Sequence, residues 1–298
     1  MEARYYETEP GTQVLVESQR PGGASRGEIL LVHGLESSSR AGYMLSMAQA
    51  ALEAGYAASR FNMRGCGAAE HLAPAFYNAG LTVDLRKVLE QFHRRGRTPV
   101  HLAGYSLGGN VVLKLAGEWA EDARPFIASV SAISASIDLE ASCRAIQRPE
   151  NFLYHRRFVR RLIARTRRRL EANPNLAVHP EFHRAQTIIE FDDLVTAPAF
   201  GFRDAADYYR RQSAIRFIER IRVPTQLIYA LDDPLIPASM YEDPSIDANL
   251  YIRRVAVRHG GHVGFIARGP HRFWLDHAVL AWIEEVEAGR ALAWSGSL

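Results

Sequence analysis

Short apolar runs alternate with longer amphipathic segments along most of the chain. This alternation is typical of βαβ units, in which helices connect parallel strands. The apolar runs predict strands over Gln13–Glu17, Glu28–His33, Tyr56–Asn62, Pro99–Ala103, Phe126–Ser134, Val223–Ala230 and Leu250–Val257. Helical spacing of apolar residues predicts helices over Ser38–Ala54, Gly80–Arg94, a segment that ends near Ala120, and Gly269–Glu287. We therefore expect an α/β fold with a mostly parallel central sheet that is flanked by helices.

The alternation stops after the strand Phe126–Ser134. Between residues 136 and 216 the sequence is polar with helical periodicity, and it contains no convincing buried strand. We interpret this stretch as a helical cap inserted into the fold. The predicted organisation is a first part of the core over residues 1–135, the cap over residues 136–216, and the second part of the core over residues 217–298.

The composition is that of an ordinary globular protein, with 47% apolar and 23% charged residues in a chain of 298. It argues against a disordered chain, a collagen-like fibre and a small disulfide scaffold. Cys66 and Cys143 are the only cysteines, and the amino terminus has no apolar leader. We therefore expect reduced thiols and a cytoplasmic location. The sequence has no apolar window long enough for a membrane-spanning helix.

The segment Gly104-Tyr105-Ser106-Leu107-Gly108 joins a predicted strand to a predicted helix. A serine between two glycines in this context is typical of a nucleophile elbow, in which the serine occupies a sharp, strained turn. The glycines allow the strand and the helix to approach without a Cβ clash. The turn places the serine hydroxyl at the carboxyl edge of the sheet, where open α/β sheets bind ligands. We therefore predict that Ser106 is a nucleophile.

A serine hydroxyl needs a base to accept its proton. His262 lies in the glycine-rich loop Gly260–Phe265, just after the last predicted strand. A base in that loop agrees with the chain order serine, acid, histidine that belongs to this type of elbow. His259 is the alternative base, because it lies closer to the end of the strand. We favour His262, since the base must reach Ser106 from a loop over the edge of the sheet.

The third group must orient the imidazole and stabilise its protonated form. Asp232 and Asp233 both follow the strand Val223–Ala230, where such an acid belongs. Because side chains alternate along an extended chain, we expect only one of the two to point at His262. We prefer Asp233, which directly precedes Pro234. Asp138, after the strand Phe126–Ser134, is a weaker third candidate.

Acyl transfer also needs hydrogen-bond donors for a developing oxyanion. We predict the backbone N–H groups of Leu107, after the nucleophile, and of Leu35, in the loop after the strand Glu28–His33. His33 is expected to tether that loop. No cluster of cysteine and histidine has metal-ligand spacing, so neither a metal nor a cofactor is expected. The paired carboxylates Asp192 and Asp193 lack histidine neighbours, and we expect them to pair with arginine or to cap a helix.

Together these segments resemble the α/β-hydrolases, and specifically the bacterial YheT-like hydrolases of the AB hydrolase 4 family. The resemblance spans nearly the whole chain and rests on His33–Glu36, Phe61–Cys66, Gly104–Asn110, Phe191–Pro198, Asp232–Pro234 and Gly260–Phe265. It implies an α/β-hydrolase fold with a helical cap inserted after the sixth strand. It also implies a charge relay of Ser106, Asp233 and His262, and carboxylic-ester hydrolase activity. Ser37 departs from the glycine that we expect in many relatives, which concerns the mouth of the oxyanion loop.

The positive charge of the chain is concentrated in the cap. Between Arg144 and Arg184 there are eleven arginines and three glutamates, an excess of eight positive charges in a chain whose net charge is +3. Arginines and apolar residues interleave there as in a basic amphipathic helix. The simplest interpretation is a solvated helix face whose apolar stripe packs on the core. The second is peripheral contact with an anionic membrane. Nucleic acid is not expected, because no recognised binding motif accompanies the charge.

These inferences predict a serine hydrolase that cleaves carboxylic esters of small molecules, with short- to medium-chain acyl groups or lipid-like substrates. The first alternative is an acyltransferase, in which an alcohol other than water intercepts the same acyl-enzyme. The second is a non-catalytic scaffold with this fold, because fold alone does not fix function. The presence of the serine, acid and histidine candidates in the expected order argues against the scaffold.

Overall fold

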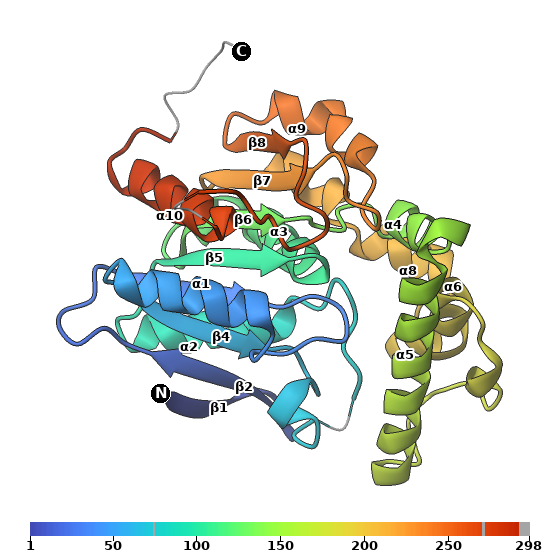
Figure 1. Ribbon diagram of the computed structural model, residues 1–298. Helices are drawn as coiled ribbons and strands as arrows, with labels where there is room; N and C mark the ends of the chain where they lie inside the picture. The colour runs from blue at the N-terminus through green and yellow to red at the C-terminus, as the bar shows by residue number, and fades with distance from the viewer. Residues whose placement is uncertain (74, 270–271, 292–298) are drawn as a thin grey trace.

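The computed structural model describes residues 1–73, 75–269 and 272–291. An eight-stranded sheet crosses the molecule in the order β1-β2-β4-β3-β5-β6-β7-β8 (Figure 1). The strands are β1 (Glu2–Glu9), β2 (Thr12–Gln19), β3 (Glu28–Val32), β4 (Ala57–Asn62), β5 (Val100–Tyr105), β6 (Ile127–Ile133), β7 (Thr225–Ala230) and β8 (Ile252–Val257). All neighbouring strands from β4 to β8 are parallel, and β2 pairs antiparallel with both β1 and β4. The mostly parallel sheet predicted from the sequence is therefore confirmed.

Strand β1 is absent from the sequence prediction. Only Tyr6 and Thr8 of this edge strand are buried. Such a strand needs no apolar run, because most of its side chains face solvent. The local hydrophobic pattern therefore gives no signal for β1, whose pairing with β2 is set by the folded sheet.

Helices cover both faces of the sheet (Figure 1). The helices α1 (Gly42–Glu53) and α10 (Trp274–Glu287) pack on one face, and α2 (Val83–Arg94) and α3 (Leu107–Trp119) pack on the other. Helix α1 begins at Gly42 rather than at Ser38 as predicted. The serines before it do not cap it, because the Ser39 hydroxyl donates to the buried carboxylate of Glu17 in β2. Helix α10 likewise begins later than predicted, at Trp274.

Between β6 and β7 the chain is helical, and we call residues 136–216 the cap segment. Its helices are α4 (Leu139–Ile146), α5 (Phe152–Ala172), α6 (Ile188–Phe191), α7 (Ala197–Phe200) and α8 (Ala205–Gln212). The segment lies beyond the carboxyl ends of the parallel strands (Figure 1). At its end a 3-10 helix over Ala214–Arg220 crosses the predicted boundary at residue 216 and packs on α3. Helix α9 (Pro244–Ala248) belongs to the core after β7.

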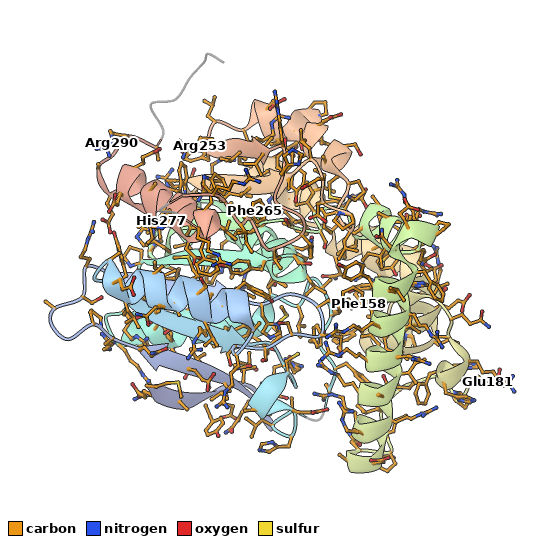
Figure 2. All side chains as sticks on the ribbon, in the orientation of Figure 1. Phe158, Glu181, Arg253, Phe265, His277 and Arg290 are labelled. Carbon is orange, nitrogen blue, oxygen red and sulfur yellow. The ribbon has the colours of Figure 1, made fainter. Side chains whose placement is uncertain are left out.

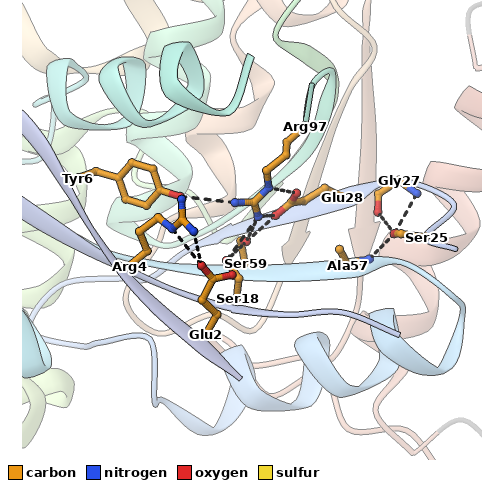
Figure 3. A network of polar contacts seen from close by, with 10 residues as sticks. All are labelled: Glu2, Arg4, Tyr6, Ser18, Ser25, Gly27, Glu28, Ala57, Ser59 and Arg97. Carbon is orange, nitrogen blue, oxygen red and sulfur yellow. Dashed lines mark hydrogen bonds and ion pairs between the residues drawn. The ribbon is translucent and has the colours of Figure 1, made fainter. Parts of the chain in front are cut away.

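A buried polar network fixes the end of the sheet that lies away from the cap segment (Figure 3). Arg97, from the loop between α2 and β5, pairs with the buried carboxylate of Glu28 at the start of β3. The Ser59 hydroxyl of β4 donates to the same carboxylate over 2.5 Å and lies 2.6 Å from the Ser18 hydroxyl of β2. Three strands and a loop are thereby held in register at this end.

None of the described helices is both long enough and apolar enough to cross a lipid bilayer.

Candidate active site

Ser106 occupies a strained turn between β5 and α3. Its backbone has φ +54° and ψ −119°, a conformation that costs energy for any residue with a Cβ. The two flanking glycines permit the turn. A Cβ on Gly104 would lie 2.4 Å from the carbonyl oxygen of Gly108, and one on Gly108 would lie 2.4 Å from that of His33. The close approach of β5, α3 and the loop after β3 therefore fixes the position of the serine hydroxyl.

Three predicted residues meet at the carboxyl edge of the sheet. The Ser106 Oγ lies 2.9 Å from Nε2 of His262, and Nδ1 of His262 lies 2.9 Å from Oδ2 of Asp233. The other oxygen of Asp233 accepts the backbone N–H groups of Leu235 at 2.9 Å and Ile236 at 3.1 Å. The Asp233 side chain is only 1% exposed. When His262 donates from Nδ1 to this carboxylate, its Nε2 is free to accept the serine proton.

The alternative site residues lie elsewhere. Asp232 accepts the N–H groups of Gly260 and Gly261 at 2.8 and 2.9 Å, and so holds the loop after β8 in place. These two hydrogen bonds lower the pKa of Asp232. His259 is exposed, and its Nδ1 lies 3.3 Å from Asp232. Asp138 caps the amino terminus of α4 through its side chain. Neither alternative acid contacts the imidazole of His262.

Both predicted oxyanion donors line the cavity beside Ser106. Leu107 is the first residue of α3, and the first N–H groups of a helix have no partner within it. Leu35 lies in the turn after β3, between two residues whose N–H groups are already engaged. The N–H groups of those neighbours, Gly34 and Glu36, donate to tyrosine hydroxyls, of Tyr43 at 3.1 Å and of Tyr77 at 3.2 Å. The turn is thus held from both sides of Leu35.

His33 ties the same turn to β4. Its Nε2 accepts the N–H of Met63 at 3.1 Å, and its Nδ1 lies 2.8 Å from the carbonyl oxygen of Gly34. Since Nε2 is the acceptor, the proton resides on Nδ1 and donates to that carbonyl. Complete burial lowers the pKa of His33 to about 4, so the ring is neutral at physiological pH. This is the tethering contact that the sequence led us to expect.

A cavity of about 100 Å³ lies over Ser106 and His262. Figure 2 shows Phe158 on the side of α5 that faces the sheet, and this residue is part of the cavity wall. The other apolar side chains that the cap segment contributes are Leu139, Ile146, Leu162, Ile188, Phe191 and Val195. An apolar wall of this kind suits the hydrocarbon part of a ligand. The described residues contain no group of three or more His, Cys, Asp or Glu side chains that could hold a metal ion.

A buried ion pair in the cavity wall joins the cap segment to the turn after β3 that contains Leu35. Nη1 of Arg165 in α5 lies 3.3 Å from Oε1 of Glu36, and the two side chains are 12% and 4% exposed. Burial raises the pKa of the Glu36 carboxyl, and the positive charge of Arg165 opposes that rise. Arg165 also donates to the sulfur of Cys66 at 3.0 Å. No motif spacing links these residues, so sequence reasoning had no signal for the pair.

Asp192 is a second buried acid of the cavity wall, within a π-helical turn over Asp192–Thr196. Its oxygens accept the hydroxyls of Tyr209 at 2.6 Å and Thr196 at 2.5 Å. Burial raises the pKa of Asp192 to about 6. Asp193 accepts the N–H of Ala205 at 2.6 Å, at the first residue of α8. The expectation of structural roles therefore agrees with these contacts, but the two aspartates bind hydroxyls and a helix terminus rather than arginine.

Comparisons with known proteins agree with this architecture. The model of the alpha/beta hydrolase fold matches residues 28–268. "Putative esterase YheT" of Escherichia coli is 34% identical over 90% of this chain and 80% of its own length. A monoacylglycerol lipase of Saccharomyces cerevisiae is 28% identical over 83% of this chain, which spans 56% of that enzyme.

Solved structures add a likeness in fold. The Pyrococcus furiosus esterase Pf2001 superposes with a TM-score of 0.61 at 16% identity, covering 95% of this chain and 92% of its own. The Butyrivibrio proteoclasticus protein Est1E with bound ferulic acid gives a TM-score of 0.63 at 14% identity, covering 96% of this chain and 100% of its own. From the family match and the similarity to the Escherichia coli protein, this chain belongs to the α/β-hydrolases and, within them, to the YheT-like proteins.

Proposed function

We propose that the protein is a serine hydrolase of carboxylic esters. The observation that carries this proposal is the continuous hydrogen-bond chain from Ser106 through His262 to Asp233, beneath an apolar cavity. Such a chain activates a hydroxyl that is otherwise a poor nucleophile. Similarity to proteins named as an esterase and a monoacylglycerol lipase supports an ester as the substrate.

In the proposed mechanism, the Ser106 Oγ attacks the ester carbonyl carbon while its proton passes to Nε2 of His262. Asp233 holds the imidazole and stabilises its positive charge. The N–H groups of Leu35 and Leu107 donate to the tetrahedral oxyanion. When the intermediate collapses, the carbon–oxygen bond of the ester breaks and His262 protonates the departing alcohol. Water then attacks the acyl-enzyme by the same steps, which releases the acid and restores the serine.

The cavity supports a preference within the ester substrates. Its walls are mainly apolar but its volume is only about 100 Å³, which favours short acyl groups over long ones. Hydrolysis of nitrophenyl esters of increasing acyl length measures this preference directly. We expect kcat/KM to fall from short to long chains. A maximum at long chains would instead favour lipid-like substrates and require the cap segment to move.

The decisive experiment compares two serine variants in the same cavity. Ser106→Ala should abolish covalent labelling by a fluorophosphonate probe and lower kcat by about 10³-fold or more. Ser136→Ala removes another hydroxyl of the cavity wall and should leave labelling intact. Persistent labelling of the Ser106→Ala variant would overturn the assignment.

A cytoplasmic location belongs to the same proposal. Cys66 and Cys143 are both free and buried. Reduced thiols are typical of proteins in a reducing compartment. Cell fractionation of the native host tests this part independently of the chemistry.

A further inference from the structure

The arginines of α5 fall into two groups with different surroundings. Arg165 and Arg169 are largely buried against the core, and Arg169 donates to the carbonyl oxygens of Ala73 at 3.0 Å and Ala75 at 2.6 Å. Arg168 pairs with Glu70 at 2.9 Å. These contacts, all in the second half of the helix, attach the cap segment to the core.

In the first half of α5, Arg161 donates to the carbonyl oxygen of Glu36 at 3.5 Å, but three other arginines have no such partners. Arg156, Arg157 and Arg160 are exposed and form no hydrogen bond or ion pair with any residue that the structure describes. Arg156 lies over the Phe152 ring, 5.9 Å from its centroid. No acidic residue lies between Phe152 and Arg161. Attachment of the cap therefore does not explain these three charges.

The same part of the helix exposes three consecutive large apolar side chains. Phe152, Leu153 and Tyr154 are 55%, 78% and 53% exposed. They are not part of the stripe that packs inward, which continues from Phe158 and Val159. A run of exposed apolar side chains on a monomer indicates a surface that contacts something else.

Helical spacing brings the two kinds of side chain together. Leu153, Arg157 and Arg160 follow one another at intervals of four and three residues, which places them on one face of α5. We call the set of Phe152, Leu153, Tyr154, Arg156, Arg157 and Arg160 the outer α5 surface. Apolar and cationic side chains interleave on it. Helices that lie on membranes use this arrangement, with apolar side chains at the acyl boundary and arginines at the lipid phosphates.

We propose that the outer α5 surface binds the surface of an anionic lipid bilayer. A second copy of the chain fits less well, because a two-fold contact would bring like charges together without acidic partners. Nucleic acid would satisfy the arginines but would leave Leu153, the most exposed of the three apolar side chains, in water. This proposal does not depend on the proposed function, since none of the six residues contacts Ser106.

Membrane binding would also orient the cavity. The inner face of α5 carries Phe158 and Leu162, which line the space over Ser106. The helix that would rest on the lipid is thus the helix that covers the proposed catalytic serine.

The test is flotation of the full-length Ser106→Ala protein, so that vesicle binding is measured apart from ester hydrolysis. We expect it to float with vesicles that contain phosphatidylglycerol at low salt, and to do so weakly with pure phosphatidylcholine or at high salt. Arg156→Gln, Arg157→Gln and Arg160→Gln together should lower the partition coefficient about 100-fold, at roughly fivefold for each arginine. Leu153→Ser with Tyr154→Ser should weaken the binding that remains at intermediate salt.

A matched control removes three exposed arginines from other elements. Arg94→Gln, Arg216→Gln and Arg220→Gln together change the net charge equally and should bind vesicles like the parent. The proposal fails if the parent does not float at low salt, or if the control loses as much binding as the α5 variant. It also fails if sedimentation shows that the outer α5 surface instead holds two copies of the chain together. Circular dichroism of each variant verifies that it is folded.

Discussion

The sheet and the cap segment form the two walls of one cavity in different ways. The sheet wall carries Ser106, Asp233 and His262 on short loops at strand ends, where backbone N–H groups hold Asp233 and side-chain hydrogen bonds join the three residues. The cap wall is mainly apolar, and side-chain contacts such as the Arg165–Glu36 pair attach it to the core. The three residues of the proposed charge relay thus lie on the wall that the sheet builds. The wall that shapes the ligand is held by apolar packing on the core and by ion pairs that single substitutions can remove.

The largest expected effect contrasts two neighbouring acids of the sheet wall. Asp233→Asn should lower kcat on a nitrophenyl ester by about 10³-fold or more, because the amide cannot hold the imidazole in the required tautomer. Asp232→Asn keeps one oxygen that can accept the N–H groups of Gly260 and Gly261, so its kcat should change less than about tenfold. Equal losses in the two variants would contradict the assignment of the acid.

The next effect is on the attachment of the cap wall. Arg165→Met leaves the Glu36 carboxylate buried without its partner, and should lower the free energy of unfolding by about 3 kcal/mol. The double variant Glu36→Gln, Arg165→Met should recover part of this loss. Arg168→Gln on the same helix breaks an exposed pair and should cost less than about 1 kcal/mol. Urea denaturation measures the free energy of unfolding of all three variants. A large loss of stability in Arg168→Gln would contradict the difference expected between the buried and the exposed ion pair.

A smaller effect is the pH dependence of stability that the cap wall contributes. The pKa of Asp192 is raised to about 6 from 3.8, so the native state binds this proton more tightly than the unfolded chain. The stability that the protonated Asp192 carboxyl contributes is complete below pH 3.8 and is lost as the pH rises through 6. Relative to Asp192→Asn, the wild type should lose about 2 kcal/mol of unfolding free energy between pH 4 and 7. Urea denaturation at several pH values measures this difference, and a constant difference would contradict it.

His33, in the sheet wall, should contribute a pH dependence of stability with the opposite sign. Its pKa is lowered to about 4 from 6.5, so the stability linked to its neutral ring is present above pH 6.5 and is lost as the pH falls through 4. Acid should therefore weaken the sheet wall while it favours the cap contact of Asp192. An NMR titration in which His33 gained its proton near pH 6.5 would disagree with its burial.

The smallest effect concerns the outer α5 surface. Replacing Arg156, Arg157 and Arg160 by Gln should change the free energy of unfolding by no more than about 0.5 kcal/mol, because these side chains are exposed and unpaired within the described structure. Hydrolysis of a soluble nitrophenyl ester should also stay unchanged. A clear loss of stability would show that these arginines help to attach the cap wall, and would blur the distinction between the two halves of α5.

The sequence predicted the structure best where the structure depends on residues that are close together in the chain. The order of strand, serine turn and helix around Ser106 follows from Gly104 and Gly108, whose spacing the fold requires. It reached least far at β1, whose exposed side chains leave no apolar run, and at the serines before α1, which contact Glu17 instead of capping the helix. In both cases the partner lies on another strand, so the local sequence pattern carries no information about it.

The sequence by itself determined the parallel α/β sheet, the strained serine turn and the concentration of arginine in the cap segment, because each depends on residues close together in the chain. Only the tertiary structure decided that Asp233 rather than Asp232 meets His262, and that Arg165 meets Glu36. It also decided which arginines of α5 are buried and which are exposed. Contacts of this kind form when helices and loops from distant parts of the sequence pack together. The packing depends on the shapes of surfaces that lie far apart in the sequence.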